Sequence, residues 1–317
     1  MNKRVFVVVA ILLGAVPAIA ADSWPAKPIR MISPYPPGGG IDGSARIISQ
    51  ALSEQLGQQV VIENRAGASG RIGTEVAAKS PADGYTLVMG SVAPNAIIPS
   101  SAPSLPYKQS HFSPVSLVAS TEYTLVVHPS LPARSVRELI NLARAKPGEL
   151  AFASSGNLGA PHLAGELMNL LGKVTTVHVA YKGTGPAAVA VLSGETVMAF
   201  GSGPAVAPHV KAGRLIALAT TGSKRSSPNV PVMSETLPGY EVTQWYGVLV
   251  PAGTPHAIVE RLHKEIAAAT RKPKVAEQFR NLGAEPTSLT PQEFDVFIRA
   301  ETEKWGRVIA AAKIPVD

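Results

Sequence analysis

Strand-like and helix-like segments alternate along almost the whole chain, and this alternation restricts the fold more than any other feature. Short apolar runs at residues 29–32, 60–63 and 85–89 have the length and composition of buried strands. Amphipathic helical patterns follow the first two runs, at 45–56 and 72–79. Because successive parallel strands need a long crossover connection, which is usually a helix, the pattern predicts an α/β fold with mixed, largely parallel sheets.

The alternation continues to the C-terminus. It predicts further strands at 116–120, 123–127, 150–153, 175–179, 197–200, 215–220 and 247–250, and further helices at 135–145, 160–171, 186–192, 205–212, 255–270, 273–282 and 291–311. Ser135 has the residue type of a helix N-cap, and Glu138 stands at the capping-box position behind it.

Two places look like crossings between lobes. Two strand-like runs stand nearly end to end within 116–127, and the second place is the segment 243–250. Two crossings predict a discontinuous first lobe, made of residues 21–120 and 245–317, with an inserted second lobe at 121–244. A cleft between such lobes is the natural position for a ligand.

Residues 1–20 have the features of a secretory signal peptide. Lys3 and Arg4 precede an apolar core at 5–16, which is too short to span a bilayer. Ala18-Ile19-Ala20 forms a small-x-small cleavage site, so the mature chain is predicted to begin at Ala21, in the periplasm. An uncleaved N-terminal anchor is the alternative interpretation.

Composition restricts the partners. The chain has no cysteine, so an exported form relies on its core and not on disulfides. The net charge is +7, but the basic residues are dispersed and only 5% of residues are aromatic, which argues against nucleic acid binding. A mild positive field would instead help to collect small anions.

The first strand-to-helix junction is the most informative local motif. It reads Ser33-Pro34-Tyr35-Pro36-Pro37-Gly38-Gly39-Gly40-Ile41-Asp42-Gly43. Prolines stiffen its first half, and glycines allow the backbone of its second half to approach a ligand closely. The free N–H groups at the start of a helix attract anions, so the junction is a candidate site for a carboxylate or a phosphate.

The same junction formally matches the dinucleotide fingerprint, through Gly38, Gly40 and Gly43, with Glu63 twenty residues after Gly43. That match would make the chain an exported oxidoreductase. The context disfavours it, because Tyr35-Pro36-Pro37 separates the strand from the glycines, whereas the fingerprint turn begins at once.

Five more loops of similar character follow predicted strands. They are 64–70, 90–95, 154–157, 180–185 and 201–204, and each supplies backbone N–H groups, small hydroxyls or an amide. Ligands of open parallel sheets bind beyond the carboxyl ends of the strands. The alternative for any one loop is a helix cap or a tight turn, but together the loops predict a neutral donor set for a small anion.

Catalytic motifs are hard to find. The chain has no Gly-x-Ser-x-Gly elbow, no His-Glu-x-x-His motif and no Walker loop. His162 and Glu166 would share a helix face, but two groups do not make a zinc site. Asp42 is predicted to cap the first helix or to bond a ligand. We therefore predict a protein that is not an enzyme, with no cofactor and no metal.

The aromatic residues Tyr35, Tyr181, Trp245 and Tyr246 are candidates for the apolar walls of a pocket. Core packing is the alternative for each, and it is strongest for Trp245. Arg65 is a candidate carboxylate ligand, with a surface ion pair as the alternative.

Several motifs together resemble one known family, the Bug family of extracytoplasmic solute receptors for tripartite tricarboxylate transporters. They are Pro34-Tyr35-Pro36-Pro37-Gly38-Gly39-Gly40 with Asp42, Leu56-Gly57-Gln58, Val60-Val61-Ile62-Glu63-Asn64-Arg65, Asp83-Gly84-Tyr85-Thr86-Leu87 and Tyr181-Lys182-Gly183. The resemblance covers essentially the whole mature chain. It implies a two-lobed periplasmic-binding-protein (Venus-flytrap) fold that closes on a small organic carboxylate, such as a dicarboxylate, a tricarboxylate or an aromatic acid like terephthalate.

The resemblance also implies site residues and partners. The implied ligand contacts are Tyr35, Pro36, Gly39, Gly40 and Asp42 on the first loop, Ser91 and Asn95 on a neighbouring loop, and Ser154, Ser155, Gly156, His162 and Tyr181 on the second lobe. The implied partners are a carboxylate and the membrane permease subunits, with the receptor acting as a monomer. A sensor that reports to a membrane kinase is a second candidate.

The chain departs from the family pattern at Ile41, where many members have Thr, and at Met198, where many have Asp. Loss of the hydroxyl at position 41 favours a larger, partly apolar or aromatic carboxylate over a simple acidic amino acid.

Overall fold

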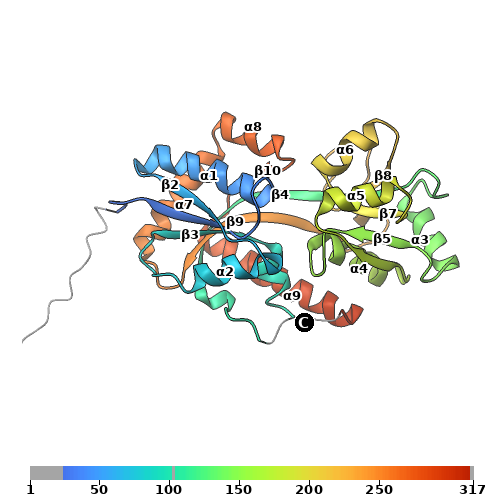
Figure 1. Cartoon of the computed structure of the whole chain (residues 1–317), viewed down its shortest axis with the longest axis horizontal. Helices are drawn as coiled ribbons and strands as arrows, with labels where there is room; N and C mark the ends of the chain where they lie inside the picture. Colours follow the sequence, from blue (N-terminus) through green and yellow to red (C-terminus); the bar gives the residue numbers. More distant parts are fainter. Residues whose placement is uncertain (1–23, 102–103, 315–317) are drawn as a thin grey trace, which may run out of the picture.

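The computed structural model describes residues 24–101 and 104–314, and the predicted signal peptide lies outside this part. Two α/β lobes stand side by side, and the long strands β4 (Phe112–Val127) and β9 (Thr243–Pro251) run between them (Figure 1). In the described ranges, no helix is both long and apolar enough to cross a membrane.

The strands of both lobes form one continuous sheet, in the order β2-β1-β3-β9-β4-β7-β5-β6, with β8 and β10 also paired to β4. The remaining strands are β1 (Ile29–Ser33), β2 (Val60–Asn64), β3 (Thr86–Ser91), β5 (Ala151–Ser154), β6 (Val177–Ala180), β7 (Met198–Ser202), β8 (Ile216–Thr220) and β10 (Glu285–Pro286). The outer strands pair parallel, whereas β4 and β9 pair antiparallel, so the sheet is mixed as predicted.

The helices follow the predicted ranges closely. They are α1 (Gly40–Leu56), α2 (Arg71–Ala78), α3 (Val136–Ala145), α4 (Ala160–Gly172), α5 (Thr184–Leu192), α6 (Gly203–Lys211), α7 (His256–Thr270), α8 (Pro273–Asn281) and α9 (Pro291–Ala312). Ser135 caps α3 as expected, because its side chain accepts a hydrogen bond from the Glu138 amide at 3.2 Å.

Alternation along the strands places apolar side chains on both faces of the sheet. Met31 on β1 and Val248 on β9 belong to the core beneath α1, α7 and α8, whereas Ile32 and Leu249 belong to the core on the opposite face. That second core continues into the other lobe, where it includes Phe152. The two lobes therefore share one apolar core along this face.

Two predicted segments differ from the structure. The runs at 116–120 and 123–127 are one strand, β4, because residues 112–122 pair with β9 and residues 123–127 pair with β7 and β8. The predicted loop at 90–95 is the end of β3 followed by a π-helix, η3 (Ala93–Ile97). Pairing with distant strands, which local composition does not report, decides both cases.

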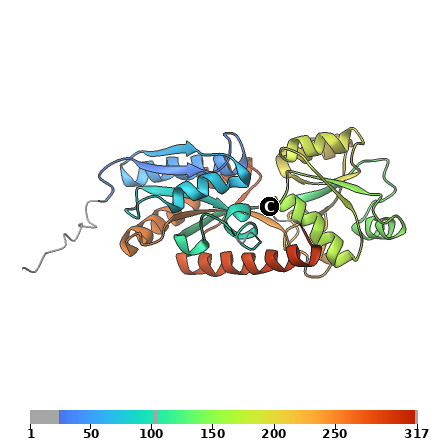
Figure 2. The same cartoon turned by 60° about the horizontal axis from the view of Figure 1, so that its bottom comes forward.

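The C-terminal helix α9 contacts both lobes. It packs against β4 and η3, and also against α4 of the second lobe. Figure 2 shows α9 running beneath the first lobe and ending below the second. The sequence-based division assigned this helix to the first lobe alone, and the contact with α4 adds a further link between the lobes.

Candidate functional site

A cleft of about 1000 Å³ lies between the two lobes. Its walls come from the segments that follow six strands, within 35–41, 66–70 and at Ala93 in the first lobe, and within 155–161, 182–184 and 202–205 in the second. Thr121, Tyr123, Gln244 and Tyr246, from the crossing strands β4 and β9, also line it. Each glycine-rich loop that the sequence indicated contributes to this one cleft.

Five helices begin at the cleft. Their N-cap residues all line it, and none makes a side-chain capping bond: Gly39 for α1, Gly70 for α2, Gly159 for α4, Gly183 for α5 and Ser202 for α6. Of the other α-helices, α3 and α9 are capped by Ser135 and Thr290, whereas α7 and α8 also lack a side-chain cap; none of these four helices has its N-cap residue at the cleft. Backbone N–H groups and helix dipoles from both lobes thus favour negative charge between them.

The side chains that line the cleft also favour negative charge. Among the described residues that line the cleft, Lys182 carries the one charge, and no carboxylate lines it. The wall also contains apolar surface, including Ile41, Pro204 and Leu282. A small anion with an apolar body would therefore match both parts of the lining.

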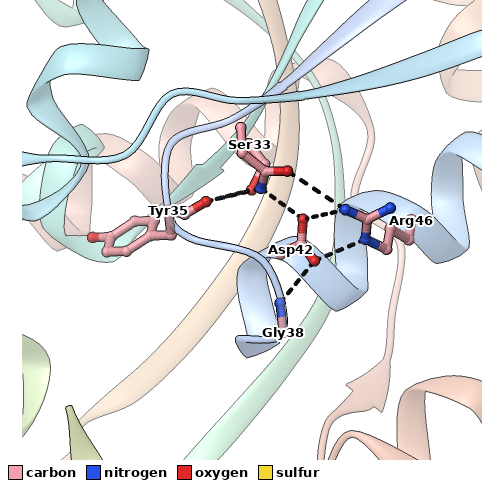
Figure 3. A network of polar contacts seen from close by, with 6 residues as sticks. Ser33, Tyr35, Gly38, Asp42 and Arg46 are labelled. Atoms are coloured by element: carbon pink, nitrogen blue, oxygen red, sulfur yellow. Dashed lines mark hydrogen bonds and ion pairs between the residues drawn. The ribbon is translucent and has the colours of Figure 1, made fainter.

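The Asp42 side chain does not line the cleft, and its carboxylate holds the first loop by hydrogen bonds. Its Oδ2 accepts hydrogen bonds from the Gly38 amide at 3.0 Å and from Arg46 Nε at 2.8 Å, and its Oδ1 accepts one from Asn64 Nδ2 at 2.7 Å. Figure 3 shows Gly38 and Arg46 converging on this carboxylate. Burial opposes its ionisation, but the bonds from Arg46, Asn64 and Gly38 outweigh burial and hold the pKa of Asp42 below its usual value.

Tyr35 is fixed on the wall of the first lobe. Its hydroxyl donates to the Ser69 carbonyl oxygen at 2.9 Å, and its own carbonyl oxygen accepts from Asn64 Nδ2 at 2.9 Å. Burial raises the pKa of Tyr35 to about 12, so the hydroxyl keeps its proton at neutral pH. Asn64 therefore links the start of the loop to Asp42 at its end.

The twelve residues that the resemblance implied as ligand contacts fall into two groups. Six line the cleft: Tyr35, Pro36, Gly39, Gly40, Ser155 and Gly156. The others are not part of its lining: Asp42, Ser91, Asn95, Ser154, His162 and Tyr181. Most of the second group support the loops from behind, as Asp42 does.

Ser91 and Asn95 are fully buried at the junction of β3 and η3, where the Ser91 amide donates to Asn95 Oδ1 at 3.0 Å. The Tyr181 side chain packs against the apolar cluster formed by α5, α6 and β7. Met198, one of the departures from the family pattern, is buried in the core, whereas Ile41 lines the cleft.

Sequence reasoning missed the residues contributed by the crossing strands and by the end of α8, which are Thr121, Tyr123, Gln244, Asn281 and Leu282. The sequence did indicate the crossings at 116–127 and 243–250. Since a cleft was expected between the lobes, residues of these crossings could have been predicted to line it. Tyr246 lines the cleft, as was considered, while Trp245 is fully buried against Phe294, in agreement with core packing.

Arg65 pairs with Glu63, which was the alternative to a ligand contact. Within residues 24–101 and 104–314, no group of three or more His, Cys, Asp or Glu side chains is placed to hold a metal ion. The site is thus built from loop backbone, small polar groups and apolar surface.

Comparison with known proteins agrees with this geometry. Residues 44–314 match the model of the tripartite tricarboxylate transporter family receptor, TctC. The chain is 40% identical over 314 residues to Protein BugT of Bordetella pertussis, with 96% of each chain covered. The chain belongs to this receptor family.

Solved TctC-family structures extend the similarity to three dimensions. The R. palustris protein Rpa4515, described with adipate, has a TM-score of 0.81 and 35% identity, covering 92% of this chain and 99% of its own. MatC from Rhodopseudomonas palustris, described with bound malate, has a TM-score of 0.78 and 27% identity, covering 90% of this chain and 100% of its own. The periplasmic-binding-protein fold expected from the sequence is therefore confirmed, and the chain is a TctC-family solute receptor.

Proposed function

We propose that this receptor works in the periplasm, where it captures a small organic carboxylate, either a di- or tricarboxylate or an aromatic acid such as terephthalate, for the permease of a tripartite tricarboxylate transporter. The observation that carries the proposal is the convergence of five helix N-termini, uncapped by side chains, on one cleft. Adipate and malate in similar structures support the same ligand class.

Donors from both lobes favour a ligand with two anionic ends. One carboxylate would meet the starts of α1 and α2, and the other would meet the starts of α4, α5 and α6, with Lys182 beside them. The apolar wall around Ile41 and Leu282 would hold the carbon chain or ring between them. On this arrangement a dicarboxylate draws the lobes together, by bending of β4 and β9 between the lobes.

We propose that residues 21–120 and 245–317 move as one body and 121–244 as the other. The strand pairing supports a division close to these limits, because the partners of β4 change between Glu122 and Tyr123. The contact between α9 and α4 would limit how far the lobes open.

Binding of acids and their amides tests the function. We expect adipate or terephthalate at 100 times its Kd to stabilise the protein by about 2.7 kcal/mol in thermal unfolding, and the matching diamide to give much less. The reason is that the helix N-termini select negative charge, which the amide lacks. Equal stabilisation by acid and diamide across the screened set would contradict the proposal.

Removing the positive charge of Lys182 tests whether the ligand has a second carboxylate at this side of the cleft. We expect Lys182→Gln to weaken dicarboxylate binding about fivefold in calorimetry, and to affect a monocarboxylate less. High salt should narrow the difference, since the side chain is exposed. Lys211→Gln on α6 is the matched control, because it removes the same charge outside the cleft lining. Equal losses from both variants would show a general field effect and not a local contact.

A further inference from the structure

Two stacked imidazoles lie behind the second-lobe wall of the cleft. His162 stands in the first turn of α4 and His178 on β6, and their ring centroids are 3.7 Å apart with an interplanar angle of 12°. The Phe152 ring covers the stack, with its centroid 5.1 Å from that of His178. Gly165 makes room for this ring, because a Cβ there would lie 2.2 Å from it.

Both imidazoles bond to the loop that runs from β5 to α4. Ser154 Oγ lies 2.6 Å from His178 Nε2 and accepts a hydrogen bond from the Gly156 amide at 3.1 Å. The Leu158 amide donates to His162 Nδ1 at 3.1 Å. Leu158 has a φ of 55°, an unfavourable conformation for a branched side chain that needs such outside support. Between these anchors, Ser155, Gly156 and Asn157 face the cleft.

We infer that His162 and His178 are positioning residues that hold the 154–159 loop in its cleft-facing form, and that loss of the Nδ1 acceptor of His162, by substitution or by protonation, releases the loop and weakens solute capture. The inference rests on the proposed function, because this loop would contact the solute. Neither imidazole lines the cleft, so the pair acts through the loop.

The hydrogen-bond geometry explains the effect of a proton. Because the Leu158 amide donates to Nδ1 of His162, that nitrogen is unprotonated and the ring proton lies on Nε2. A second proton at Nδ1 would face the Leu158 N–H, and the bond would be lost. The stack adds to the cost, because two cationic rings at 3.7 Å repel each other.

Few groups near the stack can offset that charge. Glu166 on α4 is the facing carboxylate, with Oε1 at 3.7 Å from His162 Nε2. Burial raises the pKa of Glu166 against the opposing bond from Asn169, so this carboxylate loses its charge early on acidification. Phe152 and Ser154, which contact the stack from β5, carry no charge.

Burial of the two imidazoles decides how their contribution to the free energy of unfolding changes with pH. Burial, with added repulsion from His178, lowers the pKa of His162 to about 3, and burial lowers the pKa of His178 to about 4. An unfolded histidine titrates near 6.5, so the folded protein binds fewer protons below that pH (~6.5). The stability that the pair contributes is complete above this value and is lost as the pH falls toward 4 and 3.

Two variants of His162 separate positioning from packing. His162→Leu removes the acceptor for the Leu158 amide, whereas His162→Asn keeps an oxygen near the place of Nδ1. At pH 7 we expect His162→Leu to weaken adipate binding about tenfold and to speed exchange of the Leu158 amide about tenfold in the ligand-free protein. We expect His162→Asn to stay within about threefold of the unmodified protein on both measures. His256→Asn, at a side chain 80% exposed on α7, is the control.

The pH profile gives a second readout. The free energy of unfolding, measured from pH 7 to pH 4.5, should fall more steeply for the unmodified protein than for His162→Asn, because an unfolded His162 takes up a proton near pH 6.5 while the folded one stays neutral. Parallel profiles would overturn the pH part of the inference.

The amide exchange of Leu158 needs no ligand, so it decides the positioning role even if adipate fails to bind and the proposed function is wrong. Unchanged exchange in His162→Leu would overturn the inference, and so would faster exchange with unchanged affinity. If His162→Leu does not fold, ¹⁵N NMR of the imidazole nitrogens in the unmodified protein tests the inference instead. We expect His162 to be neutral at pH 5.5 with its proton on Nε2, and a charged His162 at that pH would overturn the inference.

Discussion

Asp42→Asn is expected to lower the free energy of unfolding by about 2–3 kcal/mol and to weaken carboxylate binding in the same variant. The groups that surround the carboxylate, the Gly38 amide, Arg46 and Asn64 Nδ2, are all donors. An amide NH₂ at this position would face donors and leave at least one of them unpaired in a buried site. The Gly38–Gly40 turn would then lose the bond that holds it at the cleft.

Chemical denaturation and calorimetry on the same protein measure both effects. Asp295→Asn on α9 is a matched control, because Asp295 forms the same type of i,i+4 pair with Arg299, at 2.7 Å, but at the surface. We expect the control to change stability by less than about 0.5 kcal/mol. Because the pKa of Asp42 lies below its usual value, its contribution is complete above about pH 4 and is lost on acidification through the folded pKa. Equal effects of the two substitutions would contradict the bracing role.

Gly40→Ala is expected to weaken carboxylate binding at least tenfold, because it forces the first loop and the crossing strand apart. A Cβ at position 40 would lie 2.5 Å from the Tyr246 hydroxyl oxygen and 3.3 Å from Cζ of the same ring. Tyr246 is 6% exposed on β9 and has little room to retreat. Overpacking of this kind costs about 1–3 kcal/mol, and here the cost falls on the first residue of α1, which lines the cleft.

A double variant identifies the clash. Tyr246→Phe removes the oxygen nearest to the added Cβ, so we expect Gly40→Ala with Tyr246→Phe to recover a large part of the affinity, when compared with Tyr246→Phe alone. Gly203→Ala is the matched control, since Gly203 is also the first residue of a helix, α6, and nothing lies within 4 Å of its added Cβ. If Tyr246→Phe does not restore binding, the loss of affinity in Gly40→Ala comes from the backbone of the loop and not from the clash with the Tyr246 hydroxyl.

Much of the fold and the position of the site follow from local sequence. The apolar patterns gave the helices and strands to within a few residues, because helices and strands repeat with different periods that are visible in a short window. The glycine-rich segments after six strands were expected to gather at the strand ends, and they line one cleft. The motifs around 34–65 and 181–183 indicated the receptor family, which the comparisons confirm.

Side-chain direction could not be predicted in the same way. Asp42, Ser154 and His162 stand on segments that border the cleft, yet their polar atoms turn to Asn64, His178 and Leu158 behind it. Two of these partners lie 22 and 24 residues away along the chain. Only the packing of β2 beside β1 and of β6 beside β5 brings them within bonding distance.

The sequence by itself determined the helices and strands, the glycine-rich loops predicted to bind an anion, and the family, because each depends on residue type at short spacing. The tertiary structure decided that β4 is one strand shared by both lobes, that Tyr123, Gln244 and Tyr246 line the cleft, and that the buried His162 and the half-buried His178 stack behind its second wall. Strand pairing and core packing join residues far apart in the chain, so their outcome is fixed by the whole fold and not by any local pattern.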